Sequence, residues 1–198
     1  MNPIFIDINP ARVQEYFLTR TPLDRFRMNI NRILLPRPLC RGSWDQTTHP
    51  VETHPVYRLM EGFYWSGGDF EECRRLLASF YQERGRPPAE AETKADAKTE
   101  DLMDRYIGML DDMAVNGYRP GQRQDEVGIA IARDGTLLKT SGGWHRFAAA
   151  HLLGVSLMTA QVRFIHPGWV RSVSRGPGIR SRNKLRFLVE RLVETPGH

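Results

Sequence analysis

The stretch from residue 127 to residue 165 constrains the fold more than any other part of this chain. Two apolar runs, 127–132 and 137–140, enclose Asp134-Gly135, and Asp-Gly between two such runs is typical of a β-hairpin. A glycine pair then leads directly into a helix of small and apolar residues, which Gly154 ends, and a further run with strand character follows at 159–165. We therefore expect a domain in which strands and helices both contribute to the core.

The glycine pair and the first turn of the following helix form a candidate anion site. The first N–H groups of a helix have no partner within the helix, and the helix dipole adds partial positive charge at the same place. His145 and Arg146 stand in that first turn and can add side-chain donors to a phosphate group. The alternative is structural: both side chains pack around the start of the helix, with Arg146 paired to an internal carboxylate.

Positive charge is concentrated at the C-terminal end. The whole chain carries a net charge of +5, and residues 163–198 alone contain eight Lys and Arg against two Glu. Such a basic tail can bind nucleic acid, an anionic membrane surface or an acidic partner. The alternative is a solvated arm, because charge by itself carries no specificity.

Several classes of protein are not expected from the composition. No run of eighteen apolar residues is present, so we expect no membrane span, and the N-terminal sequence lacks the features of a secretory signal. Cys40 and Cys73 match no metal-binding spacing, and no disulfide is expected in a chain without an export signal. A cytoplasmic location is the expectation that follows.

A metal site at His49 and His54 is a weaker possibility. The two histidines are five residues apart with Glu52 between them. This spacing is poor on a helix, and a third ligand is not evident. Surface histidines in a loop are the simpler interpretation, and no metal ligand is assigned.

The first 39 residues are expected to form an N-terminal helical extension. Residues 3–8 alternate weakly and predict a short strand. Asn9-Pro10 combines an N-cap residue with proline at the first helical position, which predicts a helix over 10–19, and the same signal recurs at Thr21-Pro22. Residues 33–35 are expected to add a short strand.

Three helices and one flexible insert are expected between residues 40 and 126. A short helix ends near Gly67-Gly68, and a second covers 70–84 with Asp69 as its N-cap. Residues 85–98 are rich in charge and hold no large apolar side chain, so they predict a linker or a disordered loop. The third helix is expected over 99–116.

The segment after residue 165 is expected to have little regular structure. His166-Pro167-Gly168-Trp169 predicts a turn with an aromatic anchor, and residues 171–184 predict disorder. Residues 185–193 carry apolar side chains at helical spacing and predict a short amphipathic helix.

The run Thr140-Ser141-Gly142-Gly143-Trp144-His145-Arg146 resembles the signature of the ParB/sulfiredoxin-like superfamily. Sulfiredoxins carry Gly-Gly-Cys-His-Arg between a strand and a helix, and ParB-like proteins and the related free-serine kinases carry comparable turns. Further pieces resemble uncharacterised ParB-like proteins of bacteria and archaea: GSWD (42–45), HPVYRLMEGF (54–63), NGYRP (116–120), RDG (133–135) and GWHRFAAAHLLG (143–154). The resemblance implies an α+β domain over residues 40–170, with a small mixed sheet flanked by helices, followed by the basic tail 171–198.

The resemblance also implies a nucleotide phosphate site, with ATP and Mg²⁺ as the ligands. Lys139 would lie near the rim of this site, and Trp144 would form either a base-stacking wall or part of the core. Carried over one residue at a time, the residues that would surround the phosphates are Ser141, Gly142, Gly143, His145 and Arg146.

Two departures from the family pattern bear on the chemistry. Trp144 stands where sulfiredoxins have their reactive cysteine, so no thiolate can attack from this position. The aspartate of the Asp-Gly-x-His-Arg form of the turn is replaced by Gly142, or by Ser141 one residue earlier. A carboxylate for magnesium or for base catalysis must then come from elsewhere, and Asp45 and Glu126 are the candidates, with a surface acid as the alternative for each.

Three functions follow as hypotheses. The first is a nucleotide-binding phosphotransferase or kinase, in which Asp45 activates a small acceptor while His145 and Arg146 act on the phosphate. The second is a nucleic-acid-binding protein, in which residues 163–191 contact phosphates and Trp169 stacks on bases. The third is a scaffold that has kept the fold and lost the chemistry.

Overall fold

The computed structural model describes residues 3–17, 38–120, 126–174 and 182–194. The chain divides into two compact units. Unit 1 comprises Met1–Val51, Arg123–Gly142 and Ser156–His198, and unit 2 comprises Glu52–Gln122 and Gly143–Val155. The described strands lie in unit 1 with two helices, and four further helices form unit 2, which confirms the expected α+β fold class.

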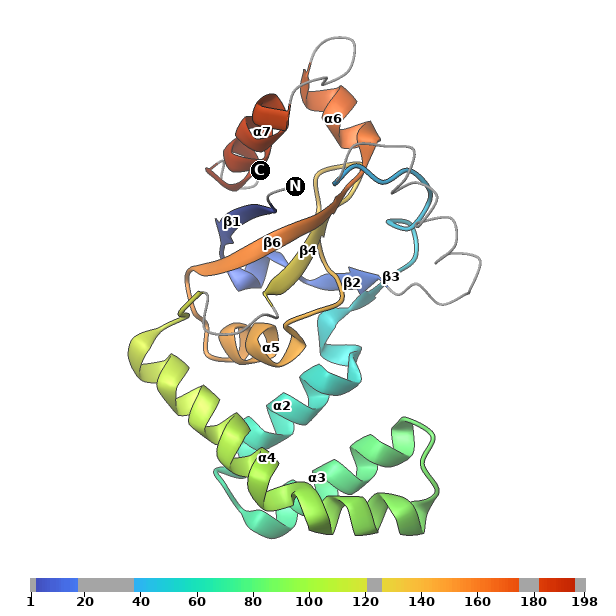
Figure 1. Ribbon diagram of the computed structural model, residues 1–198, viewed down its shortest axis with the longest axis vertical. Coiled ribbons are helices and arrows are strands. Elements are labelled where there is room, and N and C mark those ends of the chain that lie inside the picture. Colours follow the sequence, from blue (N-terminus) through green and yellow to red (C-terminus); the bar gives the residue numbers. More distant parts are fainter. Residues whose placement is uncertain (1–2, 18–37, 121–125, 175–181, 195–198) are drawn as a thin grey trace. The chain divides into compact units, whose positions relative to one another are not determined.

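Unit 1 is built on a mixed sheet with the strand order β1-β6-β4-β5-β2-β3 (Figure 1). The pairs β1–β6, β4–β5 and β2–β3 are antiparallel, whereas β4–β6 and β2–β5 are parallel. The hairpin between β4 and β5 is confirmed, and its turn is closed by a 2.9 Å hydrogen bond from the N–H of Thr136 to Oδ1 of Asp134. The strands are β1 (Ile4–Ile8), β2 (Glu15–Phe17), β3 (Thr48–Pro50), β4 (Val127–Ile131), β5 (Leu137–Lys139) and β6 (Met158–Ile165).

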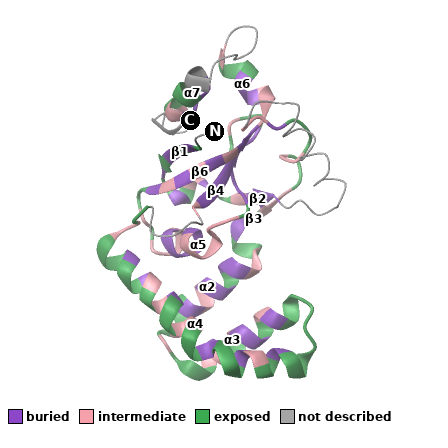
Figure 2. Ribbon diagram, viewed as in Figure 1, coloured by how far each residue is buried: buried purple, intermediate pink, exposed green. Residues whose placement is uncertain are grey.

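The centre of this sheet is β4. Each of its five residues is buried, and Figure 2 shows the strand as a continuous buried ribbon. β1, at the edge of the sheet, alternates between buried and exposed residues. This difference explains the sequence pattern, because a strand with partners on both sides and cover on both faces is apolar throughout, whereas an edge strand keeps one solvated face.

Residues 3–17, the described part of the expected helical extension before residue 38, join the sheet instead of forming a helix. The strand predicted at 3–8 is confirmed as β1, and Asn9 is an N-cap, with its Oδ1 accepting from the N–H of Ala11 at 2.9 Å. The helix stops after the single turn η1 (Pro10–Arg12), and residues 15–17 form β2. The expected helix over 10–19 is wrong, because β2 gains hydrogen-bonded partners on both sides. The elements expected from residue 21 to residue 35 lie outside the described residues.

Two helices follow the sheet in unit 1, α6 (Pro167–Ser174) and α7 (Arg182–Glu194). The turn expected at 166–169 is wrong, since α6 starts at Pro167, but Trp169 is buried, as expected of an aromatic anchor. The helix expected at 185–193 is confirmed as α7, which packs against β1. The disorder expected over 171–184 is wrong for the helical residues 171–174 and 182–184, and residues 175–181 lie outside the described ranges.

Unit 2 contains α2 (Pro55–Ser66), α3 (Phe70–Glu83), α4 (Pro88–Asn116) and α5 (Trp144–Leu152). The predicted cap of α3 is confirmed, since Oδ1 of Asp69 accepts from the N–H of Glu72 at 2.7 Å. The left-handed Gly67, with φ of 58°, ends α2 as expected. In the parts of the chain that the structure describes, none of the helices is both long enough and apolar enough to cross a membrane.

Helix α4 starts eleven residues before the expected position, so the flexible insert predicted at 85–98 is wrong from Pro88 onward. The N-terminal half of α4 is rich in Ala, Glu and Lys, which favour a helix. The buried side chains of this half are small: Ala91, Ala95 and Thr99 recur every four residues and are fully buried. Without a large apolar side chain in this stretch, the buried face of the helix could not be recognised in the sequence.

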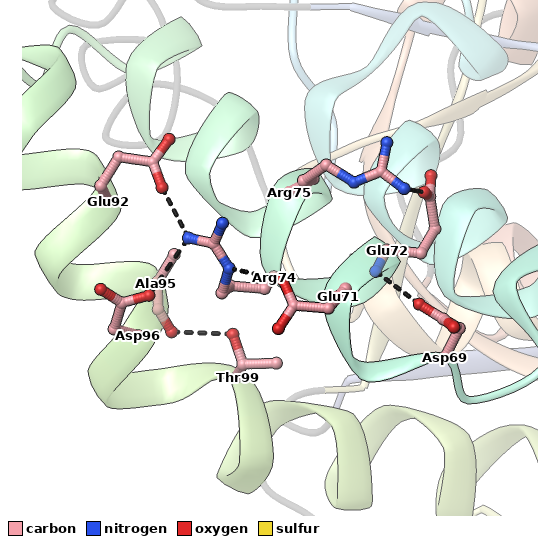
Figure 3. A network of polar contacts seen from close by, with 9 residues as sticks. All are labelled: Asp69, Glu71, Glu72, Arg74, Arg75, Glu92, Ala95, Asp96 and Thr99. Carbon is pink, nitrogen blue, oxygen red and sulfur yellow. Dashed lines mark hydrogen bonds and ion pairs between the residues drawn. The ribbon is translucent and has the colours of Figure 1, made fainter.

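Arg74 of α3 joins α3 to α4 through a group of carboxylates (Figure 3). It donates to Glu71 of its own helix at 3.2 Å, and across to Glu92 at 2.7 Å and Asp96 at 3.2 Å. The two carboxylates of α4 are four residues apart, and Ala95 lies beside them on the buried face. The guanidinium therefore fixes which turn of α4 lies against α3, while the small side chains let the helices pack closely.

Enlarging this interface should destabilise unit 2. We expect Ala95→Leu to lower the free energy of unfolding by about 1–3 kcal/mol, because the added side chain overpacks a fully buried position. The matched control is Ala97→Leu, at an exposed position two residues along the same helix, which should change it by less than about 0.5 kcal/mol. Urea denaturation of both variants measures the difference, and equal stabilities would contradict the packing described for α4.

Candidate functional site

The glycine turn from Thr140 to Arg146 contains the boundary between the two units, which falls between Gly142 and Gly143. Gly142 and Gly143 both have left-handed backbone, with φ of 89° and 64°. Residues with a side chain rarely adopt this conformation. The two halves of the turn are held by different neighbours, each within its own unit.

Lys139 lies beneath the unit 1 half of the turn. Its side chain is fully buried, and its ammonium donates to the carbonyl oxygens of Gly128 at 3.3 Å, Thr140 at 2.6 Å and Gly142 at 2.6 Å. Burial, and then the positive charge of Arg163, lower the pKa of Lys139 well below its ordinary value. The expected place of Lys139 at the rim of a phosphate site is therefore wrong: its ammonium points inward and holds the turn.

Arg163 is the cation that lies beside the unit 1 half of the turn. Along β6 it stands between Val162, which pairs with Ile129, and Phe164, which pairs with Ala130, at the point where the register of the two strands shifts. A bulge of this kind redirects a side chain and is common next to functional sites. The Nε atom of Arg163 is buried, and no described residue accepts a hydrogen bond from it.

Two glycines make room for this guanidinium. A Cβ atom at Gly142 would lie 2.6 Å from Nη2 of Arg163, and a Cβ atom at Gly128 would lie 2.6 Å from its Nε. Both distances are shorter than any ordinary contact, so a side chain at either position would displace the arginine. The unit 1 half of the turn thus combines a half-buried guanidinium with the exposed Ser141.

The unit 2 half of the turn is the start of α5. Gly143 is the N-cap residue and no side chain caps this end. The first turn of α5 contains no acidic residue, so no carboxylate of this turn offsets the helix dipole. Phe147 is the first residue whose N–H bonds back within the helix, to the carbonyl oxygen of Gly143 at 2.9 Å. The N–H groups before it lie outside the helical ladder, as an anion-binding helix end requires.

Ring contacts within unit 2 hold Trp144 and His145. The indole of Trp144 stacks on the imidazole of His54, with ring centroids 3.6 Å apart and planes 5° from parallel. The hydroxyl of Tyr106 on α4 lies 2.9 Å from Nε2 of His145. One face of Trp144 is therefore already packed, and a base-stacking role for its ring stays a prediction.

His145 is neutral at physiological pH. Burial, with a smaller contribution from the charges of Arg105 and Arg84, lowers its pKa to about 4. Burial also raises the pKa of Tyr106, so the hydroxyl keeps its proton and shares a hydrogen bond with the neutral imidazole, in which either group can donate. This hydrogen bond joins α5 to α4, and these contacts do not support the expected catalytic role of His145.

Arg146 makes contacts with the segment that follows α4. Its Nη2 donates to the carbonyl oxygen of Arg119, and its guanidinium carbon lies 4.4 Å from the centroid of the Tyr118 ring. These contacts fit the structural alternative, in which the side chain packs around the start of α5. The N–H groups and the dipole of α5 remain the anion-binding features of this half.

Asp45 is held in an ion pair that contradicts its expected role as a base. Its side chain is 1% exposed, and its Oδ2 accepts from the backbone N–H of Arg133 at 2.9 Å and from Nε at 2.8 Å, while Oδ1 accepts from Nη2 at 2.7 Å. Burial raises the pKa of this carboxyl, but the hydrogen bonds from Arg133 outweigh burial and lower it overall. A carboxylate with a low pKa and both oxygens engaged is a poor proton acceptor.

The described residues offer donors for an anion and few groups for acid–base chemistry. In the ranges that the structure describes, no group of three or more His, Cys, Asp or Glu side chains could hold a metal ion. An ATP-bound Mg²⁺ therefore stays a prediction that no described carboxylate cluster supports. Within unit 1, Arg163 and the exposed Ser141 beside it are the groups of the turn that can donate to an anion.

Some neighbours of the turn could not be identified from the sequence. In the sequence, Arg163 is recognised only as part of the basic tail. The bulge that directs its side chain toward the turn can be recognised only when both paired strands are known. Tyr106 stands on the third expected helix, but its partner His145 is 39 residues away, so the contact has no local signal. Only the left-handed glycines and the helix start carried a local signal.

Comparisons of the chain with protein-family models, with curated proteins and with solved structures found no match.

Replacing Gly142 by alanine tests the close approach of Arg163. We expect Gly142→Ala to cost about 2–3 kcal/mol of unfolding free energy, because left-handed strain adds to the contact with the guanidinium. The matched control is Gly85→Ala: Gly85 has nearly the same φ, 86°, and nothing lies within 4 Å of its added Cβ. It should lose only about 1 kcal/mol from strain. Equal losses in chemical denaturation would show that Arg163 does not press on Gly142.

The lowered pKa of His145 predicts a loss of stability in acid. The unfolded chain takes up a proton near pH 6.5, whereas the folded chain does so only near pH 4, so stability is complete above pH 6.5 and falls as the pH drops through this window. The loss of unfolding free energy should reach about 3 kcal/mol below pH 4. In His145→Gln this slope should shrink, and His151, whose pKa burial also lowers, contributes to the slope that remains. An unchanged slope in denaturation curves taken from pH 7 to pH 4 would contradict the assignment.

Proposed function

We propose that this protein binds the phosphate groups of an ATP-like nucleotide at the unit 1 half of the glycine turn, Ser141 and Gly142, with Arg163 as the principal side-chain ligand. The observation that carries the proposal is the guanidinium of Arg163, set by a strand bulge against Gly142 with a buried Nε that no described residue accepts from. Arginine donors are suited to phosphate oxygens, which accept several hydrogen bonds at once.

The same segment of the chain continues into a helix start that suits an anion. In unit 2, α5 begins without a side-chain cap and without a carboxylate in its first turn. Two left-handed glycines precede it, and neither can point a side chain at an incoming ligand. Backbone N–H groups of this kind bind phosphate in many nucleotide sites, and a strand, a glycine turn and a helix also make up the family signature that the chain resembles.

The proposal covers binding and assigns no residue to phosphate transfer. Asp45 is engaged by Arg133, and the neutral His145 is engaged by Tyr106. Lys139 is committed to carbonyl oxygens under the turn. The role of Glu126, beside the start of β4, in activating an acceptor stays a prediction, and so does a kinase activity.

The test is calorimetric titration of the protein with ATP in the presence of Mg²⁺. We expect Arg163→Gln to weaken binding at least tenfold, because hydrogen bonds between charged partners are lost. The matched control is Arg171→Gln, an exposed arginine of α6, which should bind ATP within about twofold of the unchanged protein. Equal affinities in the two variants, or no binding in any of them, would remove the proposed function.

Nucleic-acid binding is the second candidate, and the charge distribution favours it. The sequence ranges of unit 1 contain 18 Lys and Arg against nine Asp and Glu, whereas those of unit 2 contain ten against 14. A basic unit of this kind attracts a phosphate backbone without regard to sequence. An added titration with a single-stranded oligonucleotide separates the two candidates: binding that depends steeply on salt and is unaffected by Arg163→Gln would favour the nucleic acid.

A further inference from the structure

A hollow of about 350 Å³ lies in unit 2 where α3 ends and α4 begins. It is lined by Phe80 and Tyr81 of α3, by Arg84 and Arg86 of the connecting turn, and by Lys94 of α4. Three of its five lining side chains are thus cations and the other two are aromatic rings. A volume of this size is at the lower end of the range for small-molecule sites.

Two of the cations rest on the two rings. The guanidinium carbon of Arg84 lies 5.2 Å from the ring centroid of Phe80, and the ammonium of Lys94 lies 4.7 Å from that of Tyr81. A cation over a ring keeps N–H donors directed elsewhere, because the ring attracts the charge without taking a conventional hydrogen bond. The hollow therefore offers positioned positive charge.

The carboxylates nearest to Lys94 in the sequence are engaged with another residue. Glu92 and Asp96, two residues before and after it, both accept from Arg74 of α3 (Figure 3). The same contacts fix α4 against α3 and so hold Lys94 over Tyr81. Among the described residues, Lys94 forms no ion pair of its own.

The carboxylates near Arg84 and Arg86 leave most of the positive charge of these two residues without a close countercharge. Glu83, next to Arg84, binds Arg58 at 3.2 Å. Glu90 approaches Arg86 only to 3.8 Å, and no ion pair of Arg84 exists among the described residues. Loosely paired cations of this kind, of which Arg84 and Arg86 are exposed and Lys94 is half-buried, favour an anionic ligand, since it supplies the missing countercharge.

The start of α4 adds to the positive potential. Pro87 is the N-cap residue of this 29-residue helix, and no side chain caps it. The positive end of the helix dipole thus begins two residues after Arg86. Glu90, in the first turn, offsets part of this effect, so the three cations supply most of the attraction.

We propose that this hollow binds the pyrophosphate group of a small ligand, either free pyrophosphate or the di- or triphosphate of a nucleotide. Three cations match a group with several negative charges better than a single phosphate. The faces of both rings that Arg84 and Lys94 cover are closed to a nucleobase, so recognition rests on the charged group. This site lies within unit 2 and uses none of the residues of the site proposed in unit 1.

The experiment is a ¹⁵N NMR titration of the full chain with inorganic pyrophosphate, following the amide of Gly85. This residue stands between Arg84 and Arg86, so its signal reports on the hollow and not on the glycine turn. We expect Lys94→Gln and Arg84→Gln each to weaken binding about tenfold, since each removes a charged donor. Circular dichroism confirms that both variants fold, which is expected at these partly or fully exposed positions.

Two controls make the result specific. Lys98→Gln changes an exposed lysine one helical turn beyond Lys94 and should leave the affinity within about twofold. Arg163→Gln, which weakens the site proposed in unit 1, should leave the response of Gly85 unchanged. If Lys98→Gln weakens binding as much as Lys94→Gln, the attraction is general and the proposal is wrong. If Arg163→Gln abolishes the response of Gly85, the response belongs to the other site, and the proposal is also wrong.

The choice of ligand tests which group is recognised. ATP and pyrophosphate should bind with similar affinity, whereas orthophosphate and AMP should bind at least tenfold more weakly. Tight binding of ATP without binding of pyrophosphate would mean that the base is recognised, which would overturn the proposal. So would the absence of any response of Gly85 to millimolar pyrophosphate.

Discussion

The buried ammonium of Lys139 is the interaction on which the glycine turn depends. It donates to three carbonyl oxygens, of Gly128, Thr140 and Gly142. Two of them also accept a backbone N–H: Gly128 from Thr140 at 3.0 Å, and Gly142 from Gly128 at 3.4 Å. The ammonium thus joins β4, the end of β5 and the first glycine of the turn, and its burial there lowers the pKa of the lysine.

The position of Arg163 follows from the same arrangement. The bulge in β6 turns its guanidinium toward Gly128 and Gly142, where no Cβ atom is in the way. Two cations, Lys139 and Arg163, thus lie near one short stretch of backbone, and the charge of the arginine helps to lower the pKa of the lysine. A ligand of opposite charge would relieve this repulsion, which is the physical reason for expecting an anion there.

Unit 2 holds its parts together by a different means. Helix α5 is joined to α2 and α4 by pairs of rings: Trp144 with His54, His145 with Tyr106, and His151 with Tyr57. Burial in these ring contacts lowers the pKa of both His145 and His151, so the aromatic packing of α5 and its sensitivity to acid have one cause. The turn between α3 and α4 uses rings differently, to hold Arg84 and Lys94 in place without neutralising them.

Much of the local structure could be predicted from the sequence, because its signals are local. Asp134-Gly135 specified the hairpin, Asp69 and Gly67 specified helix ends, and Gly142-Gly143 before an Ala-rich run specified the turn and α5. Where the sequence misled, a partner distant in the chain decided. Residues 15–17 became a strand because β5 and β3 lie on either side, and residues 88–98 became a helix because Ala91 and Ala95 fit against α3.

By itself, the sequence determined that the chain mixes strands and helices and that a glycine turn opens into a helix suited to an anion. Only the tertiary structure decided which side chains contact that turn and in which direction they point. Lys139 faces inward, Asp45 is bound to Arg133, and Arg163 reaches the turn from a strand that begins after it. The physical reason is that a backbone conformation is specified by a few neighbouring residues, whereas the direction and charge state of a buried side chain depend on strand pairing and on desolvation.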